Sequence, residues 1–307
     1  MAIQYPYTHE EYLWNGNRVI PFNSKIYKSI ARPLVWIKAY RALKTLHKDN
    51  SLVGVLSFWC LETALIGKYF CKKFLLPHFI WILGQDARKK NKWVRWIKPE
   101  PAKLIALSAF LQHEFDKNHG IKPAHVVPNG VDPSLYRQTI QPKTIDILGV
   151  GSLVRLKQYD VFIEIISKLK AVIPGLKVAL CGKGVEEMYL HRLARELNVH
   201  ENIEFKGELP HKDILTLMQA SRILLHPSSY EGYSTVSLEA LYAGCHVVSF
   251  TFPEEREIKH WHVCKNQKEM EHRCLAILKN ETDFSSQDVH LMPDSAIKIM
   301  NLYSYPK

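Results

Sequence analysis

The sequence predicts an α/β protein of two domains, each built on a doubly wound parallel sheet. A chain of 307 residues is longer than one core of usual size, which favours two domains of ~150 residues each. Hydrophobic residues make up 47% and charged residues 23%, a globular composition that argues against a disordered chain. From Thr144 onward, short β-rich runs alternate with amphipathic stretches, which is typical of βαβ units.

The second half of the chain contains five predicted strands separated by helices. Residues 160–172 give the clearest helical signal, because their apolar side chains recur at helical spacing. Gly244 follows the last helix at the position that a helix C-terminus favours. The strands are expected at residues 145–150, 176–181, 203–205, 222–226 and 245–250, and the helices at residues 160–172, 185–197, 212–220 and 235–243.

The first half is less regular but of the same kind. Pro133 and Pro142 interrupt a polar stretch at residues 132–143, which predicts the linker between the domains. Strands are expected at residues 53–58, 79–83, 103–107 and 125–127, and helices at residues 33–47 and 62–74. The predicted domains are residues 1–138 and 139–280, followed by a tail, residues 281–307, with a helix near residues 294–303.

The positive charge of the chain is concentrated in its first half. The formal net charge is +11; residues 1–140 carry 21 Lys and Arg against 9 Asp and Glu, whereas residues 141–307 carry 20 against 21. The first domain is therefore expected to attract polyanions such as nucleic acid, anionic lipid or a phosphate-bearing substrate. Nucleic acid is disfavoured, because no helix-turn-helix, zinc finger or RNA-binding aromatic pair accompanies the charge.

The six cysteines are scattered and form no C-x-x-C pair, a pattern typical of reduced thiols in a cytoplasm. Residues 1–12 have no basic region followed by an apolar one, so a signal peptide is not expected. The most apolar stretch, residues 52–67, carries Glu62 and is shorter than the ~20 residues that a bilayer crossing needs. The expected location is therefore the cytoplasm.

A basic run at residues 88–98 interleaves Trp93 and Trp96 with six basic residues. This pattern is typical of an interfacial anchor on an anionic membrane, which would place the protein at the inner face of the membrane. It is equally typical of a basic surface loop with two core tryptophans. Both interpretations stay open from the sequence.

The stretch with the most chemical information is residues 226–243, HPSSYEGYSTVSLEALYA. A strand ends at His226, a loop of small polar residues follows, and a helix begins near Ser234 or Thr235, either of which can cap it. The N-terminus of such a helix offers free backbone N–H groups and a positive dipole end, which suit phosphate. Glu231 and Glu239 bracket this point, and their carboxylates can accept hydrogen bonds from the hydroxyls of ribose or a sugar.

Glu231 and Glu239 have the spacing of the E-x7-E motif, and here the chain resembles the retaining GT-B glycosyltransferases of family GT4. The segments GVGSLVRLKQYDVFIE, HVVPNGVD and GQDAR also resemble this family, so the likeness covers nearly the whole chain. The resemblance implies two Rossmann-like domains that face each other across a cleft, with a C-terminal helix that packs on the first domain. It also implies transfer of a sugar from a nucleotide-diphosphate sugar to a glycan or lipid-linked acceptor with retention of configuration, without a metal or another cofactor.

The resemblance implies a role for each residue that matches the motif. Glu239 would bind the ribose, Glu231 the hydroxyls of the transferred sugar, and Lys157 would neutralise the diphosphate as it leaves, because negative charge builds on the β-phosphate. Backbone N–H groups of the loop and helix start would hold the diphosphate or the sugar: Gly232, Tyr233, Ser234 and Thr235. Glycines at three successive strand ends would line the donor pocket together with Ser152: Gly149, Gly151, Gly182, Gly184 and Gly207. Three residues are expected on the acceptor side: Gly84, Asp86 and Asn129.

The chain departs from the family pattern in three places. Ser152 stands where members usually have Arg, so either Arg155 supplies the second cation or fewer charges hold the diphosphate. Leu83 stands before Gly84 where many members have His, which argues against Asp86 as a base. The chain begins in what looks like the second strand region, so the first βα unit is expected to be absent.

Two other functions stay open from the sequence. A catalytically inactive GT-B remnant would bind nucleotide or a partner, which a missing first unit favours. A nucleotide-sugar epimerase would share the fold. A zinc site at His260, His262 and Cys264 is not expected, because nothing nearby offers a fourth ligand, and a serine nucleophile is not expected, because no G-x-S-x-G elbow is present.

Overall fold

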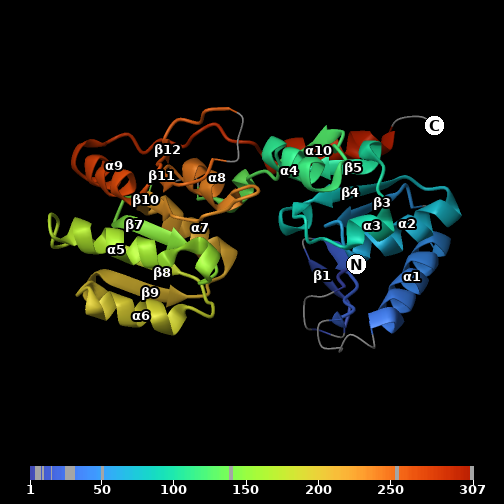
Figure 1. The fold of residues 1–307 in the computed structure, drawn as a ribbon, viewed down its shortest axis with the longest axis horizontal. Helices are drawn as coiled ribbons and strands as arrows, with labels where there is room; N and C mark the ends of the chain where they lie inside the picture. The colour runs from blue at the N-terminus through green and yellow to red at the C-terminus, as the bar shows by residue number, and fades with distance from the viewer. Residues whose placement is uncertain are drawn as a thin grey trace. The chain divides into compact units, whose positions relative to one another are not determined.

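A computed structural model describes residues 1–3, 8, 10–14, 16–24, 32–49, 52–137, 141–252 and 256–304. The chain divides into two compact units, each with its own parallel sheet and helices (Figure 1). The first unit contains Met1–Leu107, Leu111–Val126 and Met300–Lys307, and the second unit contains Ser108–Phe110 and Val127–Ile299. The expected boundary between residues 138 and 139 lies outside the described residues.

The second unit holds a six-stranded parallel sheet in the order β12-β11-β10-β7-β8-β9. The chain builds β7 to β9 on one side, then returns to place β10 on the other side of β7, so the strand order reverses between β7 and β10. The strands are β7 (Ile145–Val150), β8 (Val178–Cys181), β9 (Ile203–Gly207), β10 (Ser221–His226), β11 (His246–Ser249) and β12 (Trp261–Val263). The helices are α5 (Tyr159–Lys170), α6 (Glu187–Glu196), α7 (His211–Gln219), α8 (Thr235–Tyr242) and α9 (Gln267–Asn280).

Helices cover both faces of this sheet. α5 packs beside α6 and α9, whereas α7 packs beside α8. In α5, Phe162, Ile166 and Leu169 follow one another at helical spacing and are at most 1% exposed, so they form the stripe that packs on the strands. The strands are apolar along their length because both faces of the sheet are covered.

The first unit contains a four-stranded parallel sheet whose strands follow chain order, and a short antiparallel hairpin. Phe70 and Ile66 of α2 pack against Val35 and Leu43 of α1 in one apolar cluster. The sheet is β3 (Val55–Phe58), β4 (His78–Ile82), β5 (Leu104–Ala106) and β6 (His125–Val126), and the hairpin is β1 (Tyr12–Trp14) and β2 (Asn17–Val19). The helices are α1 (Arg32–Asp49), α2 (Glu62–Phe74), α3 (Trp93–Ile97) and α4 (Ala109–His119).

The predicted α/β class and every predicted strand and helix are confirmed, with ends that differ by a few residues. The hairpin β1–β2, the edge strand β12 and the helices α3, α4 and α9 were not predicted. In α4 only Leu111 and Phe115 are buried, so its apolar pattern is too sparse to mark a helix. The opening segment with the expected second strand region lies partly outside the described residues.

The tail contains the expected helix, α10 (Met292–Ser304). Its residue Tyr303 belongs to the first unit and packs edge-on against Phe79 of β4, with ring centroids 5.0 Å apart. The same ring fills the space beside Gly54, where a Cβ atom would lie 2.4 Å from the tyrosine ring. The last turns of α10 are therefore part of the core of the first unit.

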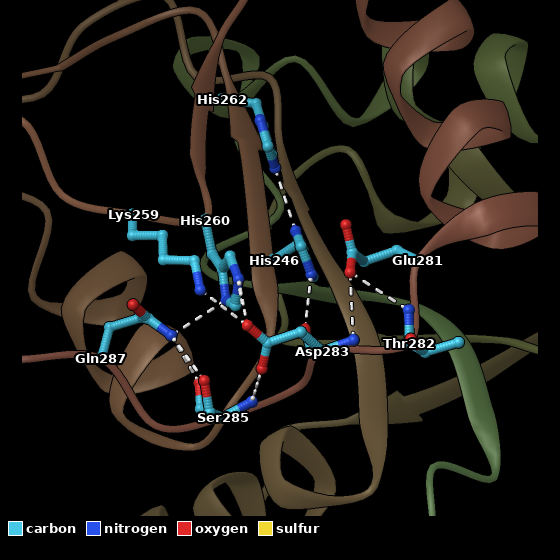
Figure 2. A network of polar contacts seen from close by, with 9 residues as sticks. All are labelled: His246, Lys259, His260, His262, Glu281, Thr282, Asp283, Ser285 and Gln287. Atoms are coloured by element: carbon cyan, nitrogen blue, oxygen red, sulfur yellow. Dashed lines mark hydrogen bonds and ion pairs between the residues drawn. The ribbon is translucent and has the colours of Figure 1, made fainter.

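Three histidines of the second unit contact one another and the start of the tail (Figure 2). The Nδ1 atom of His246 lies 3.0 Å from Nε2 of His262, and its Nε2 atom lies 3.0 Å from the backbone oxygen of Asp283. His260 stacks on His246 with ring centroids 4.0 Å apart, and Lys259 donates to the Asp283 carboxylate at 2.7 Å. His260 and His262 are thus engaged with other protein groups, and Cys264 belongs to the hydrophobic core.

This histidine cluster is expected to make folding stability depend on pH. Burial, then the charges of Arg273, His246 and His260, lower the pKa of His262 to about 4, with Glu281 opposing. Because the unfolded chain titrates near 6.5, the unfolded state binds this proton first. The contribution of neutral His262 to the free energy of unfolding is complete above pH ~6.5. As the pH falls towards 4, this contribution of about 1–3 kcal/mol is lost.

The variant His262→Asn is expected to lose less thermal stability than the wild type between pH 8 and pH 5. His272→Asn, an exposed histidine on α9, is the matched control and should behave like the wild type. The unfolding midpoint at the two pH values measures the effect. An equal acid shift in all three proteins would show that His262 does not titrate as described.

Candidate functional site

The candidate site lies at the carboxyl ends of β7 and β10, the two neighbouring strands where the strand order reverses. Leu148 of β7 pairs with Leu224 of β10, so the loops that follow these strands open side by side. Open α/β sheets bind ligands in the crevice at this reversal. Lys157 follows β7 and Glu231 follows β10, which brings two expected catalytic residues to this point although 74 positions separate them.

Lys157 and Glu231 form an ion pair in this crevice. The Lys157 Nζ atom lies 2.5 Å from Glu231 Oε1, and the two side chains are 22% and 12% exposed. His226, the last residue of β10 and fully buried, places its Nε2 atom 2.8 Å from the same Oε1 atom. Among the described residues, Oε2 of Glu231 has no hydrogen-bond partner, so this oxygen is available to accept from a ligand hydroxyl.

The partners of Glu231 keep it ionised. Burial alone would raise the pKa of this carboxyl, but the hydrogen bond and charge of His226 and the ammonium of Lys157 outweigh burial and lower the pKa to about 2. A carboxylate that is always charged can orient sugar hydroxyls and can balance a positive charge that develops nearby. It is a poor general acid at neutral pH.

Glu239 lies on α8, four residues after its first residue Thr235, and faces α7. Its Oε1 atom is 2.8 Å from Nε2 of His211, and its side chain is 15% exposed. Burial raises the pKa of Glu239, and His211 opposes this shift. The helix is fixed at this residue by Tyr136, whose hydroxyl donates to the backbone oxygen of Glu239 at 3.2 Å.

The start of α8 has the free N–H groups that the sequence predicted, but no cap. Ser234 occupies the N-cap position, yet its hydroxyl pairs with that of Ser237 at 2.7 Å and makes no capping bond. In the first turn, the N–H group of Ser237 donates to the backbone oxygen of Ser234 at 3.1 Å, whereas the N–H groups of Thr235 and Val236 precede the first helical acceptor and are available to an anion. The loop before the helix is held by Tyr233, whose hydroxyl donates to the backbone oxygen of Asn129 at 2.6 Å.

Close backbone packing requires glycine at two of the strand ends. A Cβ atom on Gly182 would lie 1.9 Å from the backbone oxygen of Gly151, and one on Gly184 would lie 2.1 Å from that of Leu153. Gly182 and Gly151 also have φ values of +139° and +155°, which other residues rarely adopt. These glycines let the loops after β7 and β8 pack on each other.

Gly149 differs from the expected pocket lining. It is buried within β7, and a Cβ atom there would lie 2.7 Å from Leu180 and 3.0 Å from Phe162, both in the core. Gly207 is the last residue of β9, with a φ of +65°, and a Cβ atom there would lie 3.7 Å from the Lys183 side chain. Ser152 and Arg155 are exposed in the segment after β7, and among the described residues Arg155 forms no ion pair.

The three expected acceptor-side residues belong to different units. Gly84 and Asp86 lie in the loop after β4 in the first unit, whereas Asn129 belongs to the second unit and places its amide nitrogen 3.5 Å from Thr235 Oγ1. Asp86 is 2% exposed and accepts N–H bonds from Cys60, Leu83 and Gly84 at 2.9–3.1 Å. Its carboxylate therefore organises the loop after β4.

Sequence reasoning missed two residues of the site, His226 and His211. His226 stands at a strand end five positions before Glu231, and this closeness was the one available signal. His211 is 28 positions from Glu239 and meets it only because α7 and α8 pack together. Among the described residues, no group of three His, Cys, Asp or Glu side chains is placed to hold a metal ion.

The two Rossmann-like units have the GT-B fold, the fold of a class of glycosyltransferases, and comparisons with known proteins agree. Residues 136–287 match the family model of glycosyl transferases group 1, and residues 5–135 match that of glycosyltransferase family 4. The chain therefore belongs to the group 1, family 4 glycosyltransferases.

Individual relatives are distant. Glycogen synthase of Mycobacterium tuberculosis is 28% identical over 177 residues, which cover 56% of this chain and 43% of that protein, so the chain spans less than half of its length. Sucrose-phosphate synthase of Thermosynechococcus elongatus has a TM-score of 0.74 at 16% identity, over 98% of this chain and 86% of that chain. HepE of Anabaena, solved in complex with UDP-glucose, has a TM-score of 0.63 at 16% identity, over 89% and 84% of the two chains.

Proposed function

We propose that this protein transfers a sugar from a nucleotide-diphosphate sugar to a glycan or lipid-linked acceptor, with retention of configuration. The observation that carries the proposal is the Lys157–Glu231 pair in the crevice between β7 and β10, next to the uncapped start of α8. The three groups together offer a cation, a permanently ionised carboxylate and free N–H donors. A departing nucleoside diphosphate and a sugar with several hydroxyls need these groups.

In the proposed reaction, Lys157 stabilises the leaving diphosphate. Negative charge builds on the β-phosphate as the glycosidic bond breaks, and a cation fixed beside it lowers the barrier. The Oε1 atom of Glu231 is anchored by Lys157 and His226, which leaves Oε2 to orient the sugar. Glu239 binds the ribose hydroxyls, and the N–H groups at the start of α8 receive phosphate oxygens. Arg155, exposed on the same segment as Lys157, adds a second cation.

The proposed place of action is the cytoplasm, at the inner face of a membrane. All six cysteines are free and buried, as expected in a reducing compartment. In the described part of the chain, no helix is both long enough and apolar enough to span a bilayer. Contact with the membrane would therefore come from the surface of the first unit, which carries the excess of basic residues.

A donor panel tests the proposal. UDP-glucose is the first donor to try, because HepE was solved with it, followed by other nucleotide-diphosphate sugars. Release of nucleoside diphosphate that requires an acceptor supports the transferase. Isomerisation of the donor without an acceptor would instead identify an epimerase, and donor binding with neither reaction would identify an inactive remnant.

Glu231→Gln is expected to lower kcat by about 10²-fold with little change in fold, because the amide keeps the shape of the side chain but loses its charge. The free enzyme's affinity for a nucleoside diphosphate without a sugar should stay near that of the wild type. Rates with saturating donor, together with calorimetry on the diphosphate, measure the two effects. Equal rates in variant and wild type would exclude a role of this charge in the chemical step.

A further inference from the structure

A basic pocket of about 530 Å³ lies in the first unit, within the basic run at residues 88–98 and its neighbours. Its lining comes from the segment that contains α3 and from the C-terminal end of α4. Its lining residues are Lys89, Asn91, Val94, Arg95, Lys98, Pro99, Asn118, His119 and Ile121. We call this site the α3–α4 pocket. None of the donor-site residues of the second unit contributes to it.

The charge of the α3–α4 pocket is positive and uncompensated. Three permanent cations line it, namely Lys89, Arg95 and Lys98, and no carboxylate is among the lining residues. Within the described part of the chain, none of these three side chains forms an ion pair. Lys89, Arg95 and Lys98 are exposed residues at the rim of one hollow, and cations around a hollow without acidic partners repel one another, so a bound anion would relieve this repulsion.

The walls of the pocket are held in place by amide side chains. The Asn91 amide donates to the backbone oxygens of Cys60 at 3.0 Å and Asp86 at 2.9 Å, which ties the segment before α3 to the loops that follow β3 and β4. The Asn118 amide donates to the backbone oxygen of Ala87 at 3.1 Å, which ties the end of α4 to the same segment. The cations therefore lie on a fixed framework and not on a loose surface loop.

A simpler explanation is that these cations only compensate helix ends. α3 and α4 both end at the pocket, and each C-terminus carries about half a negative charge. Two such ends amount to about one charge, whereas three full positive charges line the pocket. An excess remains after the helix ends are compensated.

The two tryptophans of the basic run divide between the interior and solvent. Trp93 is partly buried, with its ring 5.7 Å from that of Trp36, whereas Trp96 is 62% exposed. The sequence alternative with two core tryptophans is therefore wrong for Trp96. An exposed indole on the same short helix as Arg95 provides an apolar group that suits the interface region of a bilayer.

We propose that the α3–α4 pocket binds a phosphate-bearing ligand through Lys89, Arg95 and Lys98. A phosphate group accepts charge-assisted hydrogen bonds from all three cations. Its source is either a free phosphate compound or the headgroup of an anionic lipid, and Trp96 would contact the bilayer only in the second case. This binding does not depend on the proposed sugar transfer.

The test compares Arg95→Gln/Lys98→Gln with Arg41→Gln/Lys48→Gln, in which the same charge is removed from the exposed face of α1. Calorimetry of the full chain with pyrophosphate is the first arm. Flotation with phosphatidylcholine vesicles, with or without phosphatidylglycerol, is the second arm. The pocket variant is expected to lose about tenfold in affinity in at least one arm, while the control stays near the wild type.

The pattern of loss identifies the source of the phosphate. Loss with pyrophosphate alone indicates a free phosphate compound, and loss with anionic vesicles, accompanied by a blue shift of Trp96 fluorescence in the wild type, indicates a lipid headgroup. Equal binding by pocket variant and wild type in both arms would overturn the proposal, and so would an equal loss in the α1 control. Pyrophosphate can also bind at the proposed donor site through Lys157, so the contribution of the α3–α4 pocket is the part of the affinity that Arg95→Gln/Lys98→Gln removes and Lys157→Ala does not. Failure of the pocket variant to lose affinity leaves the transferase proposal untouched.

Discussion

Lys157→Ala is expected to lower the kcat of sugar transfer by about 10²–10³-fold, the usual cost of removing one preorganised group that stabilises developing charge. The ammonium lies in the crevice between β7 and β10, where it is only 22% exposed and its charge is weakly screened. Because charge on the β-phosphate grows during bond cleavage, the loss should appear more in kcat than in the affinity for the donor. Single-turnover rates and donor titrations measure the two effects.

Two further variants make this result specific. Lys157→Arg keeps the charge and should recover part of the rate. Lys168→Ala removes an exposed lysine from α5 and should leave the rate unchanged. Removal of Lys157 also leaves Glu231 with His226 as its remaining described partner, so the thermal midpoint of each variant must be compared with that of the wild type. A stable Lys157→Ala protein with the wild-type kcat would remove this residue from the mechanism.

Glu239→Ala is expected to weaken donor binding by about 1.5–3 kcal/mol, which is about 10- to 150-fold in Kd, because it removes a charged acceptor for two ribose hydroxyls. The side chain is 15% exposed and its Oε2 atom has no hydrogen bond among the described residues, so it is available to the ligand. Calorimetry with nucleoside diphosphates measures the loss. A nucleoside diphosphate that lacks the transferred sugar should show the full loss of affinity, since the ribose is the expected contact of Glu239.

Glu164→Ala is the matched control for this prediction, because Glu164 is an exposed carboxylate on α5. A second control, His211→Ala, removes the partner of Glu239 but keeps the carboxylate, and should cost less affinity than Glu239→Ala. If Glu239→Ala binds every nucleotide of the panel like the wild type, the ribose assignment is wrong. If both variants lose affinity equally, the position of the carboxylate matters more than its presence.

The sequence by itself determined the α/β class and the strands of the two parallel sheets apart from β12. It did so because hydrophobic periodicity and turn residues are local properties, clearest in α5 and in the strands that are apolar throughout. It also placed Glu231 at a loop and Glu239 on a helix, because strand, loop and helix follow one another within 18 residues of His226–Ala243. The sequence did not predict α4, whose apolar pattern is weak, or the short helix α3.

Tertiary structure alone decided how distant residues meet. The adjacency of β7 and β10 follows from the strand order, which is not written in any local pattern, and this order creates the contact between Lys157 and Glu231. The burial of Asp86, the place of Asn129 beside Thr235 and the packing of Gly149 on Leu180 are likewise consequences of contacts between elements far apart in the chain. Spacing in a sequence reports residue types and local geometry, whereas charge pairs, burial and pKa values depend on which elements pack together.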